Sequence, residues 1–253
     1  MRRTRGAFLR EGLSLSRSSA TGFPMAPSRS SAPAQPMPRL YLATPALDDT
    51  AAFAASLPPL LTACDVAAVL LRLNEADERT LTSRIKTLAG PVQAAGTALL
   101  VEGRQSLAVR GGADGVHVEG LEQMEDAASL KPQRIVGVGQ LHTRHDAMLA
   151  GERGADYLLF GEPSRNGERP SPEAIFERLQ WWAELFEPPC VGYAATLEEA
   201  TLFAGSGADF IMAADFIWND ARGPKAALEE AQAAIRARFE ATFSAAAGQV
   251  TRS

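Results

Sequence analysis

The chain has 253 residues, of which 46% are apolar and 22% are charged, and its formal net charge is −5. Such a composition supplies a sizeable hydrophobic core and excludes wholesale disorder, while the slight acidic excess gives no sign of a nucleic-acid partner. The two cysteines, Cys64 and Cys190, lack metal-ligand spacing and cannot form a disulfide framework. No apolar run reaches the roughly 18 residues of a membrane span, so an integral-membrane protein is also excluded.

The first part of the chain differs in composition from the rest. Residues 1–38 contain six arginines and a single acidic residue among mostly Ser, Ala, Pro and Gly. Such a segment is typical of an organellar transit peptide; the alternative, which we favour, is a start codon assigned too early, because Met25 and Met37 follow. We expect a disordered leader over 1–38, one domain over 39–247 and a tail over 248–253. Since no secretory hydrophobic region is present, we expect a cytoplasmic protein.

From residue 39 onward, short apolar runs alternate with longer stretches of helical spacing, which indicates repeated strand–helix units. The predicted strands are 39–44, 66–73, 97–102, 115–118, 134–139, 157–161, 190–194 and 210–214. The predicted helices are 48–62, 75–90, 105–111, 121–130, 143–153, 171–186, 197–206 and 224–245. Eight such units predict an α/β fold, a single (β/α)8 TIM barrel with a parallel sheet. The alternative, an open doubly wound sheet, lacks its glycine-rich fingerprint after the first strand.

Capping residues mark several of the expected helix boundaries. Helix starts are predicted at residues whose side chains cap free backbone N–H groups: Asp48, Thr143, Ser171 and Thr196. Helix ends are predicted just before glycines that accept a left-handed backbone: Gly90, Gly112, Gly154 and Gly207. Within helix 171–186, Trp181 falls about 100° from the apolar stripe. It would be exposed there and would suit a homo-oligomer interface, with an isolated surface aromatic residue as the alternative.

In a TIM barrel the reactive groups lie at the C-terminal ends of the strands. Cys190 starts its strand at the opposite end, so we do not expect it to be a nucleophile. Three aspartates, Asp114, Asp156 and Asp209, also precede strands and are expected to serve stability. The candidates in the loops after the strands are Arg72, Glu75, Glu102, Arg104, His117, Glu119, His142, Glu162, Arg165, Arg169 and Asp215.

Several motifs occur together in a recognisable order. Gly112-Ala-Asp-Gly-Val-His-Val118 resembles the Gly-Ala-Asp-Gly-Val-His-Leu signature of the thiamine phosphate synthase/TenI family. Leu70-Leu-Arg-Leu-Asn74 stands where that family has Gln-Leu-Arg-Glu-Lys, and Gly154-Ala-Asp-Tyr-Leu-Leu-Phe-Gly161 is similar to its Ala-Asp-Tyr-Ile-Gly-Phe-Gly. Ile135-Val-Gly-Val, followed by His142-Thr143, resembles its Ile-Gly-Val-Ser-x-His-Thr. The resemblance extends over about residues 39–218 and implies a TIM barrel.

The resemblance also implies an activity in thiamine biosynthesis. Synthases of this family are transferases that join a pyrimidine methyl diphosphate to a thiazole phosphate and release pyrophosphate with the help of Mg²⁺. Such chemistry needs cations for the diphosphate, carboxylates for Mg²⁺ and backbone N–H groups for the phosphate. The implied catalytic residues are Arg72, His117 and Arg169; the implied substrate contacts are Arg104, His142, Arg165, Tyr193, Ala194, Ala214 and Asp215; the implied metal ligands are Glu102 and Glu122.

The chain departs from the family pattern at each of these three places. Beside Arg72, the family's glutamine and lysine become Leu70 and Asn74, and none of the chain's three lysines lies in the loops after the strands. The family's Asn-Asp after strand three becomes Glu102-Gly103, and Glu122 is a longer ligand than the family's aspartate; shifts of this size usually defeat the octahedral geometry of Mg²⁺.

The departures at the phosphate site concern the ends of strands seven and eight. The family's Gly-Gly becomes Tyr193-Ala194, and its serine becomes Asp215. A tyrosine does not adopt positive φ cheaply, and a carboxylate repels an anion by about 1 kcal/mol or more at contact distance. We therefore expect an atypical family member that binds a small ligand, such as a thiamine precursor or a thiazole, with the Asp215 carboxylate and the Tyr193 ring filling the phosphate position. The alternative is an active synthase that uses substituted residues. Another enzyme in the same pocket, with His117 as an acid–base group, ranks last because no motif supports it.

Overall fold

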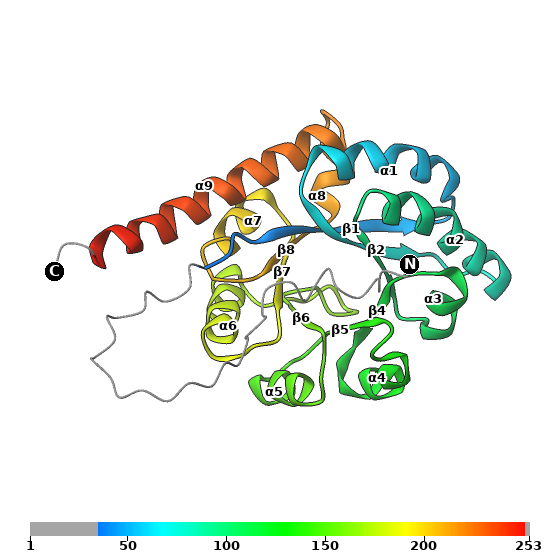
Figure 1. Cartoon of the computed structure of the whole chain (residues 1–253), viewed down its shortest axis with the longest axis horizontal. Coiled ribbons are helices and arrows are strands. Elements are labelled where there is room, and N and C mark those ends of the chain that lie inside the picture. Colours follow the sequence, from blue (N-terminus) through cyan, green and yellow to red (C-terminus); the bar gives the residue numbers. More distant parts are fainter. Residues whose placement is uncertain (1–34, 251–253) are drawn as a thin grey trace, which may run out of the picture.

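The computed structural model describes residues 35–250, with side chains described as far as Phe243. Eight parallel strands follow one another in chain order and close into a barrel, with β1 paired to both β2 and β8 (Figure 1). The strands are β1 (Arg39–Leu47), β2 (Val66–Leu73), β3 (Ala98–Glu102), β4 (Gly115–Glu119), β5 (Ile135–Gly139), β6 (Tyr157–Phe160), β7 (Cys190–Ala194) and β8 (Phe210–Ala213). The prediction of a TIM barrel is confirmed.

Helices follow the strands and form the outer layer (Figure 1). They are α1 (Ala51–Ala63), α2 (Glu78–Ala94), α3 (Gln105–Gly111), α4 (Gly120–Ala127) with the 3₁₀ turn Ala128–Leu130, α5 (Arg144–Glu152), α6 (Pro172–Leu185), α7 (Leu197–Phe203), α8 (Asp215–Trp218) and α9 (Pro224–Val250). The short helix α8 was not predicted, because its four residues are too few to show a helical period. Residues 1–34 of the expected leader and 251–253 of the expected tail lie outside the described residues.

Three of the four predicted N-caps and three of the four predicted glycine turns agree with the structure, although α7 ends at Phe203, before the predicted residue 206. The side chains of Thr143, Ser171 and Thr196 cap α5, α6 and α7. Asp48 does not cap α1, whose N-cap is Thr50, and it instead accepts a hydrogen bond from the Asn74 amide at 2.8 Å.

Another incorrect boundary is the end of α2. Gly90 does not end this helix, which continues to Ala94, and the left-handed turn falls at Gly96 with φ 79°. The other three predicted stops, Gly112, Gly154 and Gly207, all have positive φ. A glycine therefore marked the turn after a helix only where the glycine itself adopts the left-handed conformation with positive φ.

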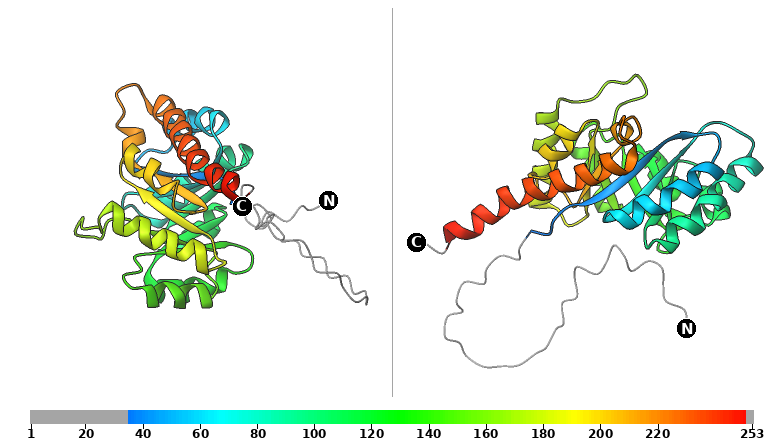
Figure 2. Two further views of the ribbon diagram at one scale, coloured as in Figure 1. Left: turned by 90° about the vertical axis from the view of Figure 1, so that its left-hand side faces the viewer. Right: turned by 90° about the horizontal axis from the view of Figure 1, so that it is seen from above.

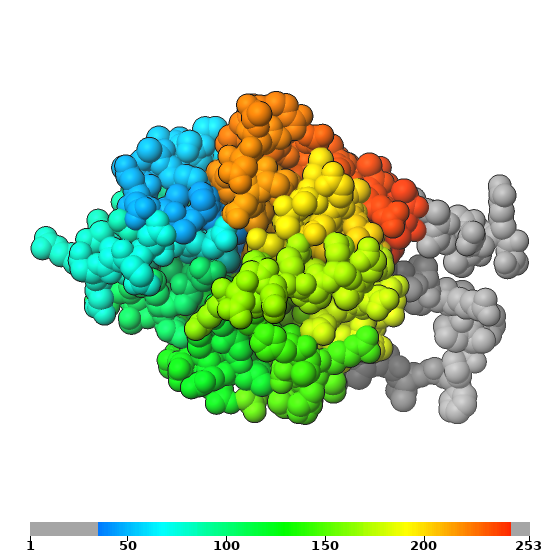
Figure 3. All heavy atoms as spheres, turned by 180° about the vertical axis from the view of Figure 1, so that it is seen from behind, coloured from blue at the N-terminus to red at the C-terminus, as the bar shows by residue number. Residues whose placement is uncertain are grey.

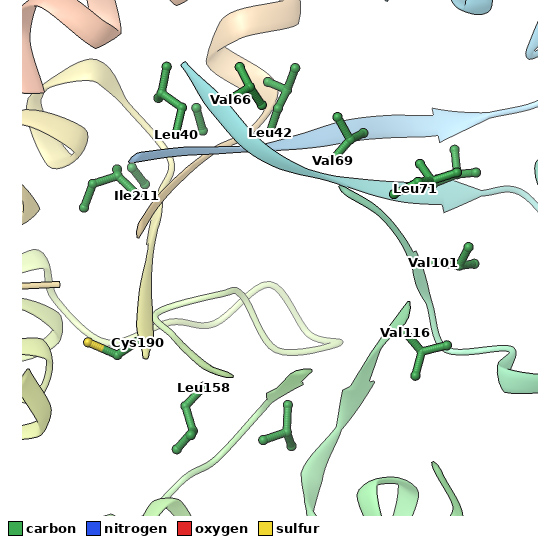
Figure 4. Close-up of a cluster of buried hydrophobic side chains, with 14 of the residues drawn as sticks. Leu40, Leu42, Val66, Val69, Leu71, Val101, Val116, Leu158, Cys190 and Ile211 are labelled. Carbon is green, nitrogen blue, oxygen red and sulfur yellow. The ribbon is translucent and has the colours of Figure 1, made fainter. Parts of the chain in front are cut away.

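Alternation along each strand divides the core into two layers. Side chains such as Leu42, Val69 and Val101 point away from the barrel axis and pack under the helices (Figure 4). The side chains between them point inward and form a separate buried cluster inside the barrel. This inner cluster is Tyr41, Ala43, Ala68, Leu70, Leu100, Tyr157, Leu159, Val191, Tyr193, Met212 and Ala214. The interior is filled by large residues near β1, β6 and β7 because β4 and β5 contribute glycines to the same face.

Gly137 shows how closely the interior is packed. A Cβ atom on this residue would lie 1.9 Å from the ring of Tyr157, a distance at which two heavy atoms overlap. A side chain at position 137 is therefore incompatible with the position of this tyrosine. The pairing of a glycine on β5 with a tyrosine on β6 places the Tyr157 hydroxyl group at the centre of the barrel.

The aspartates that precede β4, β6 and β8 brace the N-terminal face. The carboxylates of Asp114, Asp156 and Asp209 each accept a hydrogen bond at 2.9 Å from a backbone N–H group at the start of the preceding strand: Leu99 on β3, Val136 on β5 and Cys190 on β7. Each aspartate thus links two neighbouring strands where they begin, as expected for a role in stability. Cys190 is fully buried, and burial raises the pKa of its thiol.

Helices α6 and α9 complete the outer layer. Leu228, Ala231 and Ile235 are buried, and α9 packs against α1, α7 and α8 and continues beyond them (Figure 2). The prediction that Trp181 is exposed is wrong: its ring packs against Phe186 at 5.0 Å, and Leu185 is exposed instead, at 65%. The face seen in Figure 3 is made up of segments from all parts of the described chain, and the end of α9 lies at its edge. Within the described residues, no helix is long and apolar enough to cross a membrane.

Candidate active site

The C-terminal ends of the parallel strands bring the predicted charged residues to one end of the barrel. Arg72 is the last inward-facing residue of β2, after Ala68 and Leu70. Glu102 is the last residue of β3, and Glu119 is the last residue of β4. Glu162 lies two residues beyond β6, and Asp215 starts α8 just after β8. This end of the barrel, which we call the mouth, therefore holds four carboxylates and an arginine from five different strand–helix units.

Arg72 is held on two sides. Its Nε–H donates to the carbonyl oxygen of Thr44 on β1, and its Nη2–H donates to Oδ1 of Asp215 at 2.9 Å. The Arg72 side chain is 22% exposed and that of Asp215 is 61% exposed. The guanidinium group is thus fixed in direction with part of it open to solvent. Asp215 forms an ion pair with Arg72 and is not an isolated negative charge. The expectation that its carboxylate simply repels an anion therefore changes.

The position of Asp215 follows from how α8 is attached. The Trp218 indole N–H donates to the carbonyl oxygen of Ala43 at 2.7 Å, and the Trp218 ring packs against Phe53 on α1. These contacts fix the short helix beside β1. Its first residue, Asp215, therefore lies within reach of Arg72 on β2, although the two residues are 143 positions apart in the chain.

The predicted metal ligands differ in their surroundings. Glu102 is exposed at the end of β3, yet partial desolvation raises its pKa; Arg72 and Arg104 oppose the rise, and the neighbouring Glu119 adds to it. Glu122 is exposed in the first turn of α4. Carboxylate oxygens are the correct donors for Mg²⁺, which usually takes only one or two of them together with waters and phosphate oxygens. Among the described residues no group of three or more His, Cys, Asp or Glu side chains is placed to hold a metal by itself. The assignment of Glu102 and Glu122 as Mg²⁺ ligands therefore stays a prediction.

Two further arginines lie near the mouth in salt bridges. Arg104 donates to Glu75 at 2.6 Å from a left-handed backbone with φ 52°. Arg165, in the loop after β6, pairs with Glu119 at 2.8 Å, and its side chain is 82% exposed. Such exposed pairs are weak and easily exchanged. Both arginines can therefore leave their carboxylate partners for a more highly charged anion.

Arg169 has a different environment. Its guanidinium group donates to both carboxylate oxygens of Glu199, at 2.9 and 2.8 Å, to the carbonyl oxygen of Gly161 at 2.9 Å and to that of Tyr193 at 3.0 Å. It also lies over the Tyr193 ring, 5.4 Å from its centre. These contacts join the loop after β6 to β7 and to α7. The catalytic role predicted for Arg169 stays a prediction, to be tested against this anchoring role.

Glu199 also binds the backbone just after β7. The Glu199 carboxylate accepts a hydrogen bond from the backbone N–H of Ala195 at 2.8 Å. Tyr193 is 7% exposed, and its ring belongs to the inner cluster of the barrel. Ala194 and Ala214 are fully buried. A carboxylate of the chain itself thus takes up a backbone donor at the place where the resemblance implies a phosphate.

His117 is connected to a chain of hydrogen bonds inside the barrel. Its Nδ1 lies 3.0 Å from the Tyr157 hydroxyl group, which lies 2.8 Å from the hydroxyl group of Tyr41. Burial lowers the pKa of His117 to about 4 and raises the pKa of both tyrosines. The imidazole is therefore neutral near pH 7, and its orientation is set by Tyr157.

Glu162 lies beside His117. Its Oε1 accepts a hydrogen bond from the backbone N–H of Gln140, whose left-handed φ of 52° turns that N–H group toward the carboxyl group. Burial raises the pKa of Glu162 to about 7; the Gln140 amide opposes the rise, and the carboxylates of Glu119 and Glu102 add to it. A carboxyl group with such a pKa near neutrality is typical of functional sites.

Sequence reasoning located some of these residues and missed others. His142 is exposed and takes no part in the contacts described above; only its backbone oxygen is bound, by Arg178 at 3.3 Å. Tyr41, Tyr157 and Glu199 were not among the candidates, although they orient His117 and Arg169. The inward alternation of β1 and β6 could have indicated the two tyrosines, whereas no local signal identifies the partner of Arg169.

Comparisons with known proteins agree with this geometry. The profile of the thiamine monophosphate synthase family matches residues 40–217, which include every strand of the barrel and the residues at its mouth. The chain belongs to this family.

Curated relatives support the assignment. The thiamine-phosphate synthase of Rhodospirillum centenum is 41% identical over 202 residues, which cover 78% of this chain and 98% of the relative. That of Hyphomonas neptunium is 36% identical over 219 residues, covering 82% and 97%. A solved structure titled thiamine phosphate pyrophosphorylase from Pyrococcus furiosus matches with a TM-score of 0.67 and 22% identity, covering 79% of this chain and 96% of that one, which supports the barrel fold alone.

Proposed function

We propose that this protein is an active thiamine phosphate synthase. It would join hydroxymethylpyrimidine diphosphate to thiazole phosphate and release pyrophosphate. The observation that carries the proposal is the 41% identity to a relative of that name over 98% of the relative's length. The charged mouth supports it, because an oriented and partly open arginine at the end of a barrel strand suits a phosphorylated substrate. This conclusion favours the alternative drawn from the sequence over an atypical binding protein.

The reaction makes defined demands on the mouth. The bond between the pyrimidine methylene carbon and the diphosphate oxygen breaks, and its electron pair leaves with the diphosphate. The thiazole nitrogen supplies the pair for the new carbon–nitrogen bond, so the product carries a positive thiazolium ring. Arg72, with Arg104 and Arg165, would hold the departing diphosphate. Glu102 and Glu122 would hold a Mg²⁺ ion, whose chemistry would be to neutralise negative charge on the leaving diphosphate.

The remaining predicted residues would contact the second substrate and shape the pocket. We assign Tyr193, Ala194, Ala214 and Asp215 to the thiazole side, with His142 at its outer edge, whereas His117, inside the barrel, would face the pyrimidine. Arg169 would act there through Tyr193. Its guanidinium group donates a hydrogen bond to the Tyr193 carbonyl oxygen and also lies over the Tyr193 ring. We also propose a cytoplasmic location, because phosphorylated substrates do not cross membranes unaided.

A second candidate is a family member that binds a thiazole or a thiamine precursor without catalysis. The observation in its favour is the hydrogen bond from the Ala195 N–H to the Glu199 carboxylate, which takes up a donor that a phosphate would need. An active synthase has to move this carboxylate or bind the phosphate elsewhere. The two candidates therefore differ in whether the phosphate group of the thiazole contributes to binding.

An assay of the purified protein tests the proposal. With both substrates and Mg²⁺, we expect thiamine phosphate and pyrophosphate in equal amounts. Arg72→Gln should lower kcat/KM about a hundredfold or more. The control Arg153→Gln removes an exposed arginine that pairs with Glu125 and follows α5, away from the mouth, and it should leave kcat/KM unchanged. A folded protein that forms no thiamine phosphate, but is stabilised equally by thiazole alcohol and thiazole phosphate, would favour the second candidate.

A further inference from the structure

One carboxyl oxygen at the mouth has no hydrogen-bond partner. Oε2 of Glu162 is buried without a partner, while Oε1 of the same group is bound by the Gln140 N–H. A buried polar atom without a partner is costly, by about 1–3 kcal/mol or more. Such an atom calls for an explanation, and a ligand that enters the mouth can supply the missing partner. Glu162 is thus held by one oxygen while the other stays available.

The position of Gly139 shows where this carboxyl group lies. Val136 and Val138 on β5 belong to the outer core, so Gly139, one residue further, faces the interior. A Cβ atom on Gly139 would lie 2.0 Å from Oε1 of Glu162 and 2.9 Å from Nε2 of His117. Both polar groups therefore lie against the backbone of Gly139 inside the barrel, and the Glu162 carboxyl group takes the place that a side chain at position 139 would need.

The two groups carry complementary hydrogen-bonding capacity. The Glu162 carboxyl group keeps its proton up to about neutral pH, and since Oε1 accepts from Gln140, the proton resides on Oε2. When the Nδ1–H of His117 donates to the Tyr157 hydroxyl group at 3.0 Å, Nε2 of the neutral ring is left as an acceptor. The pair then offers one donor and one acceptor side by side.

The pyrimidine substrate of the proposed reaction has a matching edge. Its ring nitrogen accepts a hydrogen bond, and the amino group on the adjacent carbon donates one. We propose that Glu162 is a substrate-specificity residue, whose Oε2–H donates to the pyrimidine ring nitrogen while the pyrimidine amino group donates to Nε2 of His117. This assignment rests on the proposed function for the identity of the ligand. It requires no charge on either side, which suits a site closed off from water.

Charged and titratable groups from four strand–helix units face Glu162. Glu102 at the end of β3 and Glu119 at the end of β4 favour its neutral form. His117 on β4 and the hydroxyl groups of Tyr157 and Tyr193 complete its surroundings. The described contacts of Glu162 include no cation, so the proton is retained by the surroundings and not displaced by an ion pair.

Binding of two ligands that lack the diphosphate tests the proposal without depending on catalysis. One ligand is the aminopyrimidine alcohol that lacks the diphosphate. The other is its 4-oxo analogue, whose ring N–H and carbonyl oxygen reverse the donor and acceptor. At pH 6 we expect calorimetry to show that the protein binds the amino compound at least tenfold more tightly than the oxo compound. Glu162→Met, which keeps the length but removes the donor, should abolish this preference.

The pH dependence of the preference provides a readout that a purely structural role would not change. Above pH 7 the ionised Glu162 becomes an acceptor, so the preference for the amino compound should fall about tenfold between pH 6 and pH 8. In Glu162→Gln the amide oxygen accepts from Gln140 and the NH₂ group donates to the ligand, so the preference should persist at both pH values. Glu168→Gln, in an exposed residue of the same loop, should behave like the unmodified protein.

The outcomes separate this inference from the proposed function. A protein without synthase activity that shows the Glu162-dependent preference would retain the inference and overturn the function. An active synthase in which Glu162→Met is folded, as judged by its unfolding transition, and still prefers the amino compound tenfold would overturn the inference. Equal pH dependence in Glu162→Gln and the unmodified protein would overturn it as well.

Discussion

Nη2 of Arg72 lies 2.9 Å from Oδ1 of Asp215, and this ion pair joins the end of β2 to the start of α8. Viewed in the sequence alone, Asp215 is a negative charge at a place that suits an anion. In the structure, it partly neutralises the cation that the diphosphate would approach. The two residues therefore have to be tested together.

Replacing Asp215 by Asn should strengthen the binding of the pyrimidine diphosphate. Arg72 stays fixed through its contact with the Thr44 carbonyl oxygen, and loss of the carboxylate removes a repulsion of about 1 kcal/mol. We expect KM for the diphosphate to fall about fivefold, with a change of less than about 1 kcal/mol in the free energy of unfolding because the pair is exposed. Steady-state kinetics measure the effect; a higher KM would show that Asp215 orients Arg72.

Replacing Arg169 by Met should destabilise the fold. The ion pair with Glu199 has side-chain exposures of 19% and 13%, so the variant leaves a largely buried carboxylate without its partner. We expect the free energy of unfolding in urea to fall by about 2–3 kcal/mol.

The double variant Arg169→Met, Glu199→Gln separates anchoring from catalysis. The neutral glutamine no longer needs a cation, so stability should return in part. If Arg169 only anchors the loop, activity should return with stability; activity that stays lost in a stable double variant would assign Arg169 a direct part in the reaction.

Glu162 should make stability depend on pH. Its pKa is raised from 4.5 to about 7 in the fold, so the unfolded chain releases this proton first as the pH rises. The contribution of the group is therefore fully present below about pH 4.5 and is lost as the pH rises to about 7, by up to about 3 kcal/mol. Urea unfolding between pH 4.5 and 8 should show this decline in the unmodified protein, and a smaller decline in Glu162→Gln. Parallel curves for the two proteins would show that Glu162 is ionised at pH 6.

The aspartates of the N-terminal face should affect stability without affecting activity. Asp209→Ala removes the acceptor of the Cys190 N–H and should lower the free energy of unfolding by about 1–3 kcal/mol. Asp209→Asn keeps an acceptor oxygen, and burial already raises the pKa of this carboxyl group, so the loss should be smaller. KM for both substrates should stay unchanged, since the residue lies at the end of the barrel opposite the mouth. A raised KM would be evidence of coupling between the two ends.

Much of the fold was predictable because the relevant signals are local. The alternation of strands with helices, the caps at Thr143 and Ser171, and the positive φ at Gly154 each depend on a few neighbouring residues. The failures have tertiary causes. Gly90 is in open space and does not interrupt α2, and Trp181 packs with Phe186 and carries the Arg144 guanidinium group 4.8 Å above its ring.

The sequence by itself determined the eight strand–helix units, the family motifs and the end of the barrel at which the charged residues gather, since backbone periodicity and strand direction are properties of short segments. Only the tertiary structure decided that Asp215 pairs with Arg72, that Glu199 binds the Ala195 N–H group and that Glu162 shares a buried space with His117. Charge state and hydrogen bonding depend on distances of a few ångströms between residues that the chain separates widely. Those distances are fixed only when the barrel closes.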